Sequence, residues 1–268
     1  MKGALLVGIN YTGSSSELNG CINDVNNVKK LLLSKGYEED NITILTDETN
    51  IKPTRNNIIS ELLKLILSGA KQIFFHYSGH GSSVVDIDGD ESDGRDETLV
   101  PIDYETNGLI IDDEIRGILQ CLNYGQCMFC LIDACHSGTS IDLKYNLYER
   151  ASTGTMVMMR DRLTERKNKE LRGKCIMLSG CMDNQTSADA YIMSAAASAA
   201  ASSSAAANNT TGSFQGAMTH AFLTAMDYSH SYKELVINSR KALKNGGYAQ
   251  LPNISASYNL DLNNAIII

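Results

Sequence analysis

With 268 residues, 43% hydrophobic and 20% charged, the chain has the composition of a globular protein of one large or two small domains. A formal net charge of −8, with no long run of Lys or Arg, argues against nucleic acids and anionic membranes as partners. The opening MKGALLVGINY is too short for a membrane span, and the seven cysteines lack the paired spacing of a disulfide framework. We therefore expect a cytoplasmic protein with free thiols.

Apolar, strand-like segments alternate with segments of helical period, the pattern of βα units. Strands are predicted at 2–10, 41–46, 71–78, 126–134, 175–181 and, as an edge strand, 251–255. One helix is predicted to end at Gly36, and others to begin at Thr54, at Asp112 and at a capping box of Ser231 and Glu234. The sequence thus predicts an α/β/α sandwich of three layers around a mostly parallel sheet of about six strands.

Two segments interrupt this alternation. Residues 143–174 lose the apolar period and carry nine basic side chains, so we expect an exposed linker. Residues 194–212 consist mostly of alanine and serine, which cannot build a core, and favour a mobile loop or a short alanine helix.

Reactive side chains follow two of the predicted strands. His80 comes after strand 71–78, and Cys135 comes after strand 126–134. Functional groups of parallel sheets gather at the carboxyl ends of the strands, so these two side chains are expected to form a Cys/His dyad. Each residue alone has a structural interpretation, a packed thiol or a histidine in a turn, and only the pair favours catalysis.

The chain resembles the metacaspases, of the caspase-like clan of cysteine peptidases. The resemblance covers nearly the whole chain, in the ordered blocks GINYTGSSSELNGCINDV, HYSGHGS, DGRDETLVPIDY, LIIDDEI, DACHSG, LSGCMDNQTSADA, GAMTHAFLTAM and PNISAS. It implies a single caspase-like peptidase domain of type I arrangement without a prodomain, with residues 1–142 like the large subunit and 175–268 like the small one. It also implies His80 and Cys135 as the dyad, and the amides of Gly81 and Cys135 as the oxyanion hole.

The resemblance further implies cleavage of protein or peptide substrates after Arg or Lys. By position in the motifs, Asp24, Ser78 and Asp133 would line the pocket for that basic side chain, called S1. An alternative is that Asp24 caps the first helix and that Asp133 binds local backbone amides.

Acidic residues are concentrated in DIDGDESDGRDE, residues 86–97. An EF-hand is disfavoured because Glu91 stands where the loop needs glycine. The resemblance implies a different calcium site, formed by Asp96, Asp112, Asp113 and Asp142. The alternative is that these residues are solvated or stabilise the start of a helix without an ion.

A peptidase with this specificity is expected to cut its own basic linker, first at Lys144 or Arg150, although a solvated connection is the alternative. The resemblance also implies a monomer. Three rival interpretations are a catalytically silent binding scaffold, a nucleotide or phosphoacceptor module, and a zinc site at Cys127 and Cys130. Retention of the dyad disfavours the silent scaffold. The lack of a glycine-rich phosphate loop disfavours the nucleotide or phosphoacceptor module, and the lack of two further ligands disfavours the zinc site.

Overall fold

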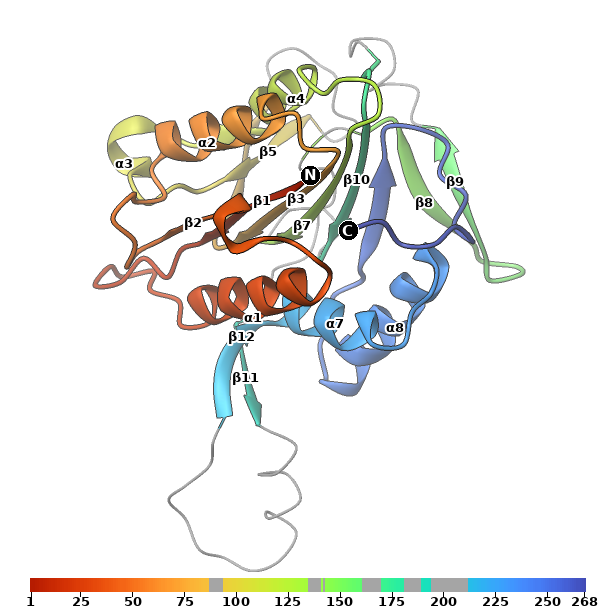
Figure 1. Cartoon of the computed structure of the whole chain (residues 1–268). Coiled ribbons are helices and arrows are strands. Elements are labelled where there is room, and N and C mark those ends of the chain that lie inside the picture. The colour runs from red at the N-terminus through yellow and green to blue at the C-terminus, as the bar shows by residue number, and fades with distance from the viewer. Residues whose placement is uncertain (87–93, 135–140, 142, 161–169, 181–188, 194–211) are drawn as a thin grey trace, which may run out of the picture.

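The computed structural model describes the chain except for residues 87–93, 135–140, 142, 161–169, 181–188 and 194–211 (Figure 1). An eight-stranded sheet forms its centre, in the order β2-β1-β3-β7-β10-β13-β8-β9. In that order the strands are β2 (Ile42–Thr46), β1 (Lys2–Gly8), β3 (Gln72–Ser78), β7 (Cys127–Asp133), β10 (Lys174–Ser179), β13 (Asn253–Ala256), β8 (Tyr145–Arg150) and β9 (Thr155–Arg160). In this sheet order, the neighbouring strands β2, β1, β3, β7 and β10 pair in parallel. The pairs β10–β13, β13–β8 and β8–β9 are antiparallel.

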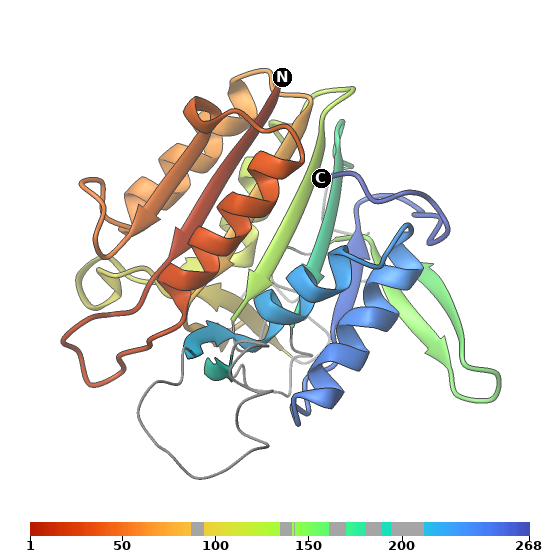
Figure 2. The same cartoon turned by 60° about the horizontal axis from the view of Figure 1, so that its bottom comes forward.

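Helices cover both faces of this sheet (Figures 1 and 2). On one face lie α1 (Cys21–Ser34), α7 (Ala217–Met226) and α8 (Tyr232–Asn245), and on the other lie α2 (Arg55–Leu67) and α4 (Asp112–Leu119). The described residues also form two short helices, η1 (Glu39–Asn41) and α3 (Tyr104–Asn107). The predicted three-layer α/β/α architecture is therefore confirmed.

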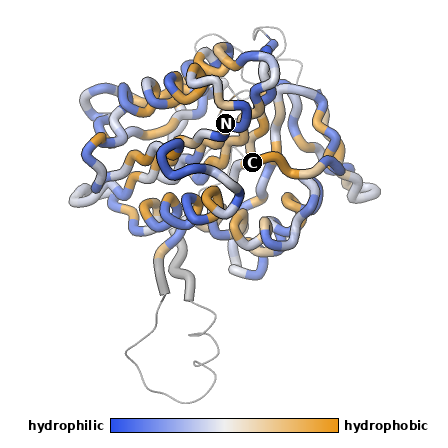
Figure 3. Tube along the Cα trace, in the orientation of Figure 1, coloured by the Kyte–Doolittle hydropathy of each residue, from blue (hydrophilic) through white to orange (hydrophobic). Residues whose placement is uncertain are grey.

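The central strands are buried on both faces, which explains why their sequences are continuously apolar. Alternate residues enter different cores: Leu6 packs with Phe74 and Phe129 beneath α1 and α7, whereas Leu5 and Phe75 pack beneath α2 and α4. The hydropathy pattern follows this arrangement, with apolar strands inside and polar helix faces outside (Figure 3). No helix within the described residues is long and apolar enough to span a membrane.

The predicted helix starts agree closely with the observed ones. The Thr54 hydroxyl accepts a hydrogen bond from the Asn57 N–H at 3.3 Å, as expected of an N-cap. Ser231 caps α8 in the same way, although Glu234 reaches back to the N–H of His230 at 2.7 Å, one residue before the cap. Asp112 is the first residue of α4 and not its N-cap.

The segment expected to be an exposed linker is partly built into the sheet. Residues 145–160 form the β8–β9 hairpin, and β8 pairs with β13. The expectation of an edge strand at 251–255 is consequently wrong, because β13 lies between β10 and β8. The apolar run Met156–Met159 in β9 is the sequence signal for this hairpin, and three side chains of the hairpin, those of Leu147, Met156 and Met158, pack against the core beneath α7 and α8.

Two small sheets flank the central one. One consists of β4 (Gly81–Val85), β5 (Arg95–Leu99) and β6 (Ile110–Ile111), and the other of β11 (Asp189–Met193) and β12 (Gly212–Gly216). Because β4 and β5 are antiparallel strands, the acidic segment between them is not flanked by the helices of an EF-hand. Of the Ala/Ser-rich tract of 194–212, residues 194–211 lie outside the described part of the chain.

Candidate active site

The ends of three neighbouring parallel strands lie in register. Gly8 of β1 pairs with Ser78 of β3, and Ser78 pairs with Asp133 of β7. The chain after β3 stays beside β7, because the Gly79 N–H donates to the Asp133 carbonyl at 3.2 Å. His80 therefore follows a strand end that is paired with the strand end preceding Cys135, which itself lies outside the described residues.

The imidazole of His80 is half-buried and held in one orientation. Its Nε2 lies 2.7 Å from the backbone carbonyl oxygen of Ser16. A carbonyl oxygen can only accept a hydrogen bond, so Nε2 carries the proton and Nδ1 carries the lone pair in the neutral ring. The geometry thus leaves Nδ1 of His80 as the available base.

The amide of Gly81 points away from its partner strand. Gly81 opposes Leu99 in the β4–β5 ladder, and at the next position the Val100 N–H donates to the His80 carbonyl at 3.2 Å. Hydrogen-bonded and non-hydrogen-bonded pairs alternate along an antiparallel ladder. The Gly81 N–H is therefore directed away from β5, an orientation suited to an oxyanion-hole donor.

The three side chains predicted to line S1 lie together. Asp24 in α1 is fully buried, and its Oδ2 accepts hydrogen bonds from the Ser78 hydroxyl at 2.6 Å and from the Gly216 N–H at 2.9 Å. Asp133 is 3% exposed, and its Oδ2 accepts from the Thr219 N–H at 2.7 Å. Asp24 is not the N-cap of α1, which is Gly20, and it binds groups of β3 and β12. Asp133 accepts a hydrogen bond from an amide of the distant α7.

Gly216 lies between the two carboxylates, at the point where β12 meets α7. A Cβ built on this residue would lie 2.1 Å from Oδ2 of Asp133 and 2.7 Å from Oδ2 of Asp24. Both carboxylates thus converge on one small volume. The first amides of α7 and the positive end of its dipole offset part of the repulsion between two buried negative charges.

Sequence reasoning missed several groups of this site. Gly216 and Thr219 contribute backbone N–H groups, and Ser16 contributes a backbone carbonyl. Backbone groups have no residue-type signature, so only the position of Gly216 at the start of the GAMTHAFLTAM block could have indicated its role.

The residues predicted to bind calcium are divided between described and undescribed parts of the chain. Asp96 in β5 and Asp112 in α4 are buried, and the Asp112 carboxylate accepts the N–H groups of Glu97 at 2.8 Å and Asp113 at 2.9 Å. Within the described residues, no three His, Cys, Asp or Glu side chains form a metal-binding group. Asp142 lies outside them. Carboxylates are the hard oxygen ligands that calcium takes, so the donor chemistry fits.

The two residues predicted as self-cleavage sites differ in exposure. The Lys144 ammonium pairs with the Glu170 carboxylate, and its side chain is 13% exposed. Arg150 is exposed at the end of β8, next to the turn of the hairpin. Of the two side chains, that of Arg150 is therefore the more accessible.

A buried histidine contacts Thr219, the residue whose amide binds Asp133. His76 in β3 is fully buried, and its Nε2 lies 3.2 Å from the hydroxyl of Thr219, whose N–H binds Asp133. Nδ1 of His76 has no hydrogen-bond partner among the described residues. Burial lowers the pKa of His76 to about 3, so this imidazole is neutral in the folded protein.

We expect His76 to make the protein less stable in acid. The unfolded chain binds a proton at His76 below its ordinary pKa of 6.5, whereas the folded chain does not until about pH 3. Between pH 7.5 and 5.5 this difference removes about 1.4 kcal/mol from the free energy of unfolding. Urea unfolding at both pH values should show this loss in the wild type and lack it in His76→Gln.

The exposed His230 provides the matched control, and His230→Gln should keep the wild-type difference between the two pH values. Full retention of that difference in His76→Gln would show that His76 is not the group responsible.

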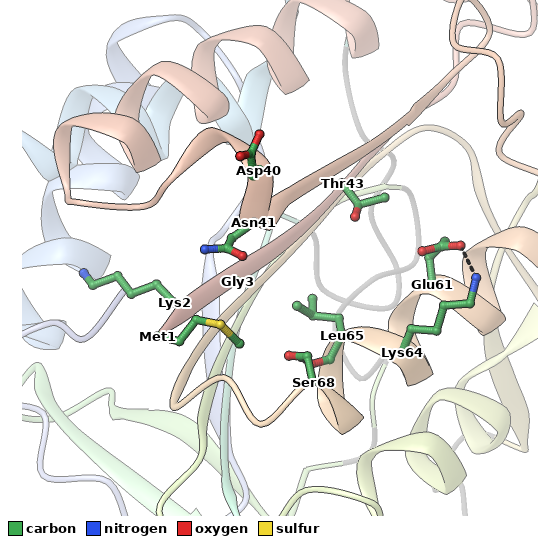
Figure 4. A pocket seen from close by; sticks show the side chains of 10 residues that line it. All are labelled: Met1, Lys2, Gly3, Asp40, Asn41, Thr43, Glu61, Lys64, Leu65 and Ser68. Atoms are coloured by element: carbon green, nitrogen blue, oxygen red, sulfur yellow. Dashed lines mark hydrogen bonds and ion pairs between the residues drawn. The ribbon is translucent and has the colours of Figure 1, made fainter.

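A separate hollow of about 190 Å³ lies at the opposite end of the central strands, beside Lys2 and Lys64 (Figure 4). The Lys2 ammonium donates to two backbone carbonyls, and Lys64 pairs with Glu61 at 2.7 Å. Both cations are thus already paired, and the hollow is not part of the site around His80.

Comparisons with known proteins identify the family of the chain. The family model "Metacaspase, peptidase C14 domain" matches residues 2–144. Metacaspase-1 of Eremothecium gossypii is 38% identical over 97% of this chain, and Metacaspase-1 of Saccharomyces cerevisiae is 36% identical over 97%. The chain spans 65% and 67% of the lengths of these two relatives.

Solved structures support the fold. A protein of Geobacter sulfurreducens has a TM-score of 0.64 at 24% identity, with 98% of this chain and 97% of that one covered. Caspase-1 from Spodoptera frugiperda has a TM-score of 0.56 at 12% identity, with 99% and 88% covered. The chain has the caspase-like fold and belongs to the metacaspase family of peptidases.

Proposed function

We propose that this chain is a calcium-stimulated cysteine endopeptidase that cleaves after arginine or lysine, with Cys135 as the nucleophile and His80 as the base. The observation that supports this proposal best is the register of β3 with β7, in which Ser78 pairs with Asp133. His80 and Cys135 each follow these paired residues by two positions. Of the proposed S1 acids, Asp133 is the last residue of β7, and Asp24 of α1 accepts a hydrogen bond from Ser78 at the end of β3.

In this proposal His80 takes the thiol proton of Cys135 on Nδ1. A free thiol has a pKa of about 8.5 and is only slightly ionised at neutral pH, so an adjacent base increases the thiolate fraction. The sulfur attacks the substrate carbonyl carbon, and the amides of Gly81 and Cys135 stabilise the oxyanion. His80 then returns the proton to the leaving amine, and water hydrolyses the thioester with His80 again acting as base.

Specificity would arise from the carboxylates that converge on Gly216. A planar guanidinium forms short, charge-assisted hydrogen bonds with carboxylates, and an ammonium can pair with the same charges. Asp24, Asp133 and Ser78 provide this acceptor set, and an acidic substrate side chain would be repelled. The S1 pocket therefore favours arginine or lysine over aspartate.

Calcium would bind Asp96, Asp112, Asp113 and Asp142. When bound, the ion would neutralise these carboxylates and link β5 and α4 to the chain that follows Cys135. Self-cleavage would occur in the segment 143–174, and we propose Arg150 ahead of Lys144 because Lys144 is paired with Glu170.

The proposed function predicts the response of the purified protein to three peptides that differ only at P1. With calcium, peptides with arginine and lysine should be cleaved at least about 100-fold faster, by kcat/KM, than the peptide with aspartate. With chelator, all rates should fall. On a gel, calcium should produce fragments whose new N-terminus, read by mass spectrometry, lies within 143–174.

Each part of the proposal has its own contradicting outcome. A preference for aspartate would contradict the S1 assignment, and equal rates with calcium and chelator would contradict the metal site. Absence of turnover of every peptide would favour the silent binding scaffold.

A further inference from the structure

We propose that Tyr11 is a positioning residue for His80, holding both the backbone and the imidazole of this base in the geometry needed for proton transfer. The inference rests on the proposed function of His80. Tyr11 lies after β1, far from His80 in sequence, and is 4% exposed.

The hydroxyl of Tyr11 replaces one hydrogen bond of a β-ladder. Beyond the Gly81–Leu99 pair, the Val100 N–H donates to the His80 carbonyl, but the His80 N–H donates to the Tyr11 hydroxyl at 3.0 Å. That hydroxyl donates in turn to the Val100 carbonyl at 2.6 Å. The phenol of Tyr11 thus bridges the two strands, and its position sets that of the His80 backbone.

The ring of Tyr11 also contacts the imidazole directly. The two ring centroids are 4.7 Å apart with an angle of 34° between the planes. Nε2, at the edge of the imidazole, binds the Ser16 carbonyl. Tyr11 at the face of the ring and Ser16 at its edge belong to the same loop after β1, and together they hold the imidazole. An aromatic face favours a neighbouring cation, so Tyr11 also stabilises the imidazolium that forms when His80 takes the thiol proton.

The backbone of Tyr11 is strained and tightly supported. Its φ of 51° is the one positive value for a non-glycine residue in the described part of the chain. The Asp47 carboxylate binds both flanking amides, that of Asn10 at 2.7 Å and that of Thr12 at 3.1 Å. Such strain persists where surrounding contacts enforce it and is concentrated at functional sites.

The Tyr11 hydroxyl keeps its proton throughout the range in which a peptidase is assayed. Burial, followed by the neighbouring Tyr77, raises the pKa of Tyr11 well above its ordinary value of 10. The Tyr77 hydroxyl lies 3.2 Å away and bonds the same Val100 carbonyl at 2.9 Å. The phenol of Tyr11 therefore remains a donor to Val100 and an acceptor from His80.

The variant Tyr11→Phe tests this role because it keeps the ring and removes the bridging hydroxyl. With a saturating peptide that has arginine at P1, we expect kcat to fall about 10- to 100-fold and KM to stay within about twofold, because proton transfer is impaired and substrate binding is not. A purely structural role would lower thermal stability without lowering kcat.

Tyr37→Phe is the matched control. Tyr37 is also buried, and its hydroxyl has no hydrogen-bond partner among the described residues. This variant should keep the wild-type kcat and KM to within about twofold, since it removes a hydroxyl that bonds nothing near His80.

A wild-type kcat in Tyr11→Phe, or a rise in KM alone, would overturn the inference. If Tyr11→Phe does not fold, nuclear magnetic resonance of the wild type decides. Cross-peaks between the Tyr11 and His80 ring protons and a proton on Nε2 of His80 are expected, and their absence would overturn the inference. If the wild type cleaves no arginyl peptide, the proposed function fails, and the same spectra still test the contact.

Discussion

Replacement of Gly216 by alanine should lower kcat/KM for arginyl peptides by at least about 100-fold, because the added methyl group would occupy the place where the carboxylates of Asp24 and Asp133, the proposed S1 acids, converge. The backbone permits the change, since Gly216 has φ −64° and ψ 134°. The new Cβ would instead clash with the Oδ2 atoms of Asp133 and Asp24, which would lie 2.1 Å and 2.7 Å from it, so these carboxylates would have to move. The measurement is kcat/KM for peptides with arginine and aspartate at P1.

The same substitution at Gly117 serves as its control. Gly117 lies in α4, and apart from its chain neighbours and its own helical backbone no described atom comes within 4 Å of a Cβ built there. Gly117→Ala should leave kcat/KM unchanged and raise the free energy of unfolding by about 0.5–1 kcal/mol, because alanine is the better helix former. An unchanged ratio of arginyl to aspartyl cleavage in Gly216→Ala would contradict the S1 assignment, and Asp24→Asn provides an independent check of it.

Much of the fold could be predicted from apolar periodicity. The parallel strands β1, β3, β7 and β10 are buried on both faces, so their side chains form largely apolar runs that sequence alone reveals. The order of these apolar runs also predicted that the ends of β3 and β7 lie side by side, as they do. The gathering of Asp24, Ser78 and Asp133 followed from the family motifs, and the structure shows the contacts that join them.

The remaining features depend on long-range pairing or on backbone groups. The β8–β9 hairpin was overlooked because its many charged neighbours hid the apolar run of β9. The contacts of Tyr11 with His80 and of Gly216 with Asp24 join residues far apart in the chain, and half of each contact is a main-chain atom. Residue types carry no information about such pairs, so only the structure could reveal them.

Cys135→Ala should lower peptide turnover by at least about 1000-fold, because removal of a nucleophile leaves only binding and oxyanion stabilisation. The protein contains another free cysteine that offers a matched control. Cys121 is exposed, and Cys121→Ala should keep the wild-type rate, since this residue lies after α4 and outside the site around His80.

The most direct test of the account is covalent labelling of the wild type by peptidyl chloromethyl ketones with arginine or aspartate at P1. Attack by the active thiolate forms a carbon–sulfur bond and releases chloride, and mass spectrometry identifies the modified cysteine. The account predicts one adduct, on Cys135, that forms at least about 100-fold faster with the arginyl reagent and is absent in Cys135→Ala. An adduct on another cysteine, or faster reaction with the aspartyl reagent, would contradict it.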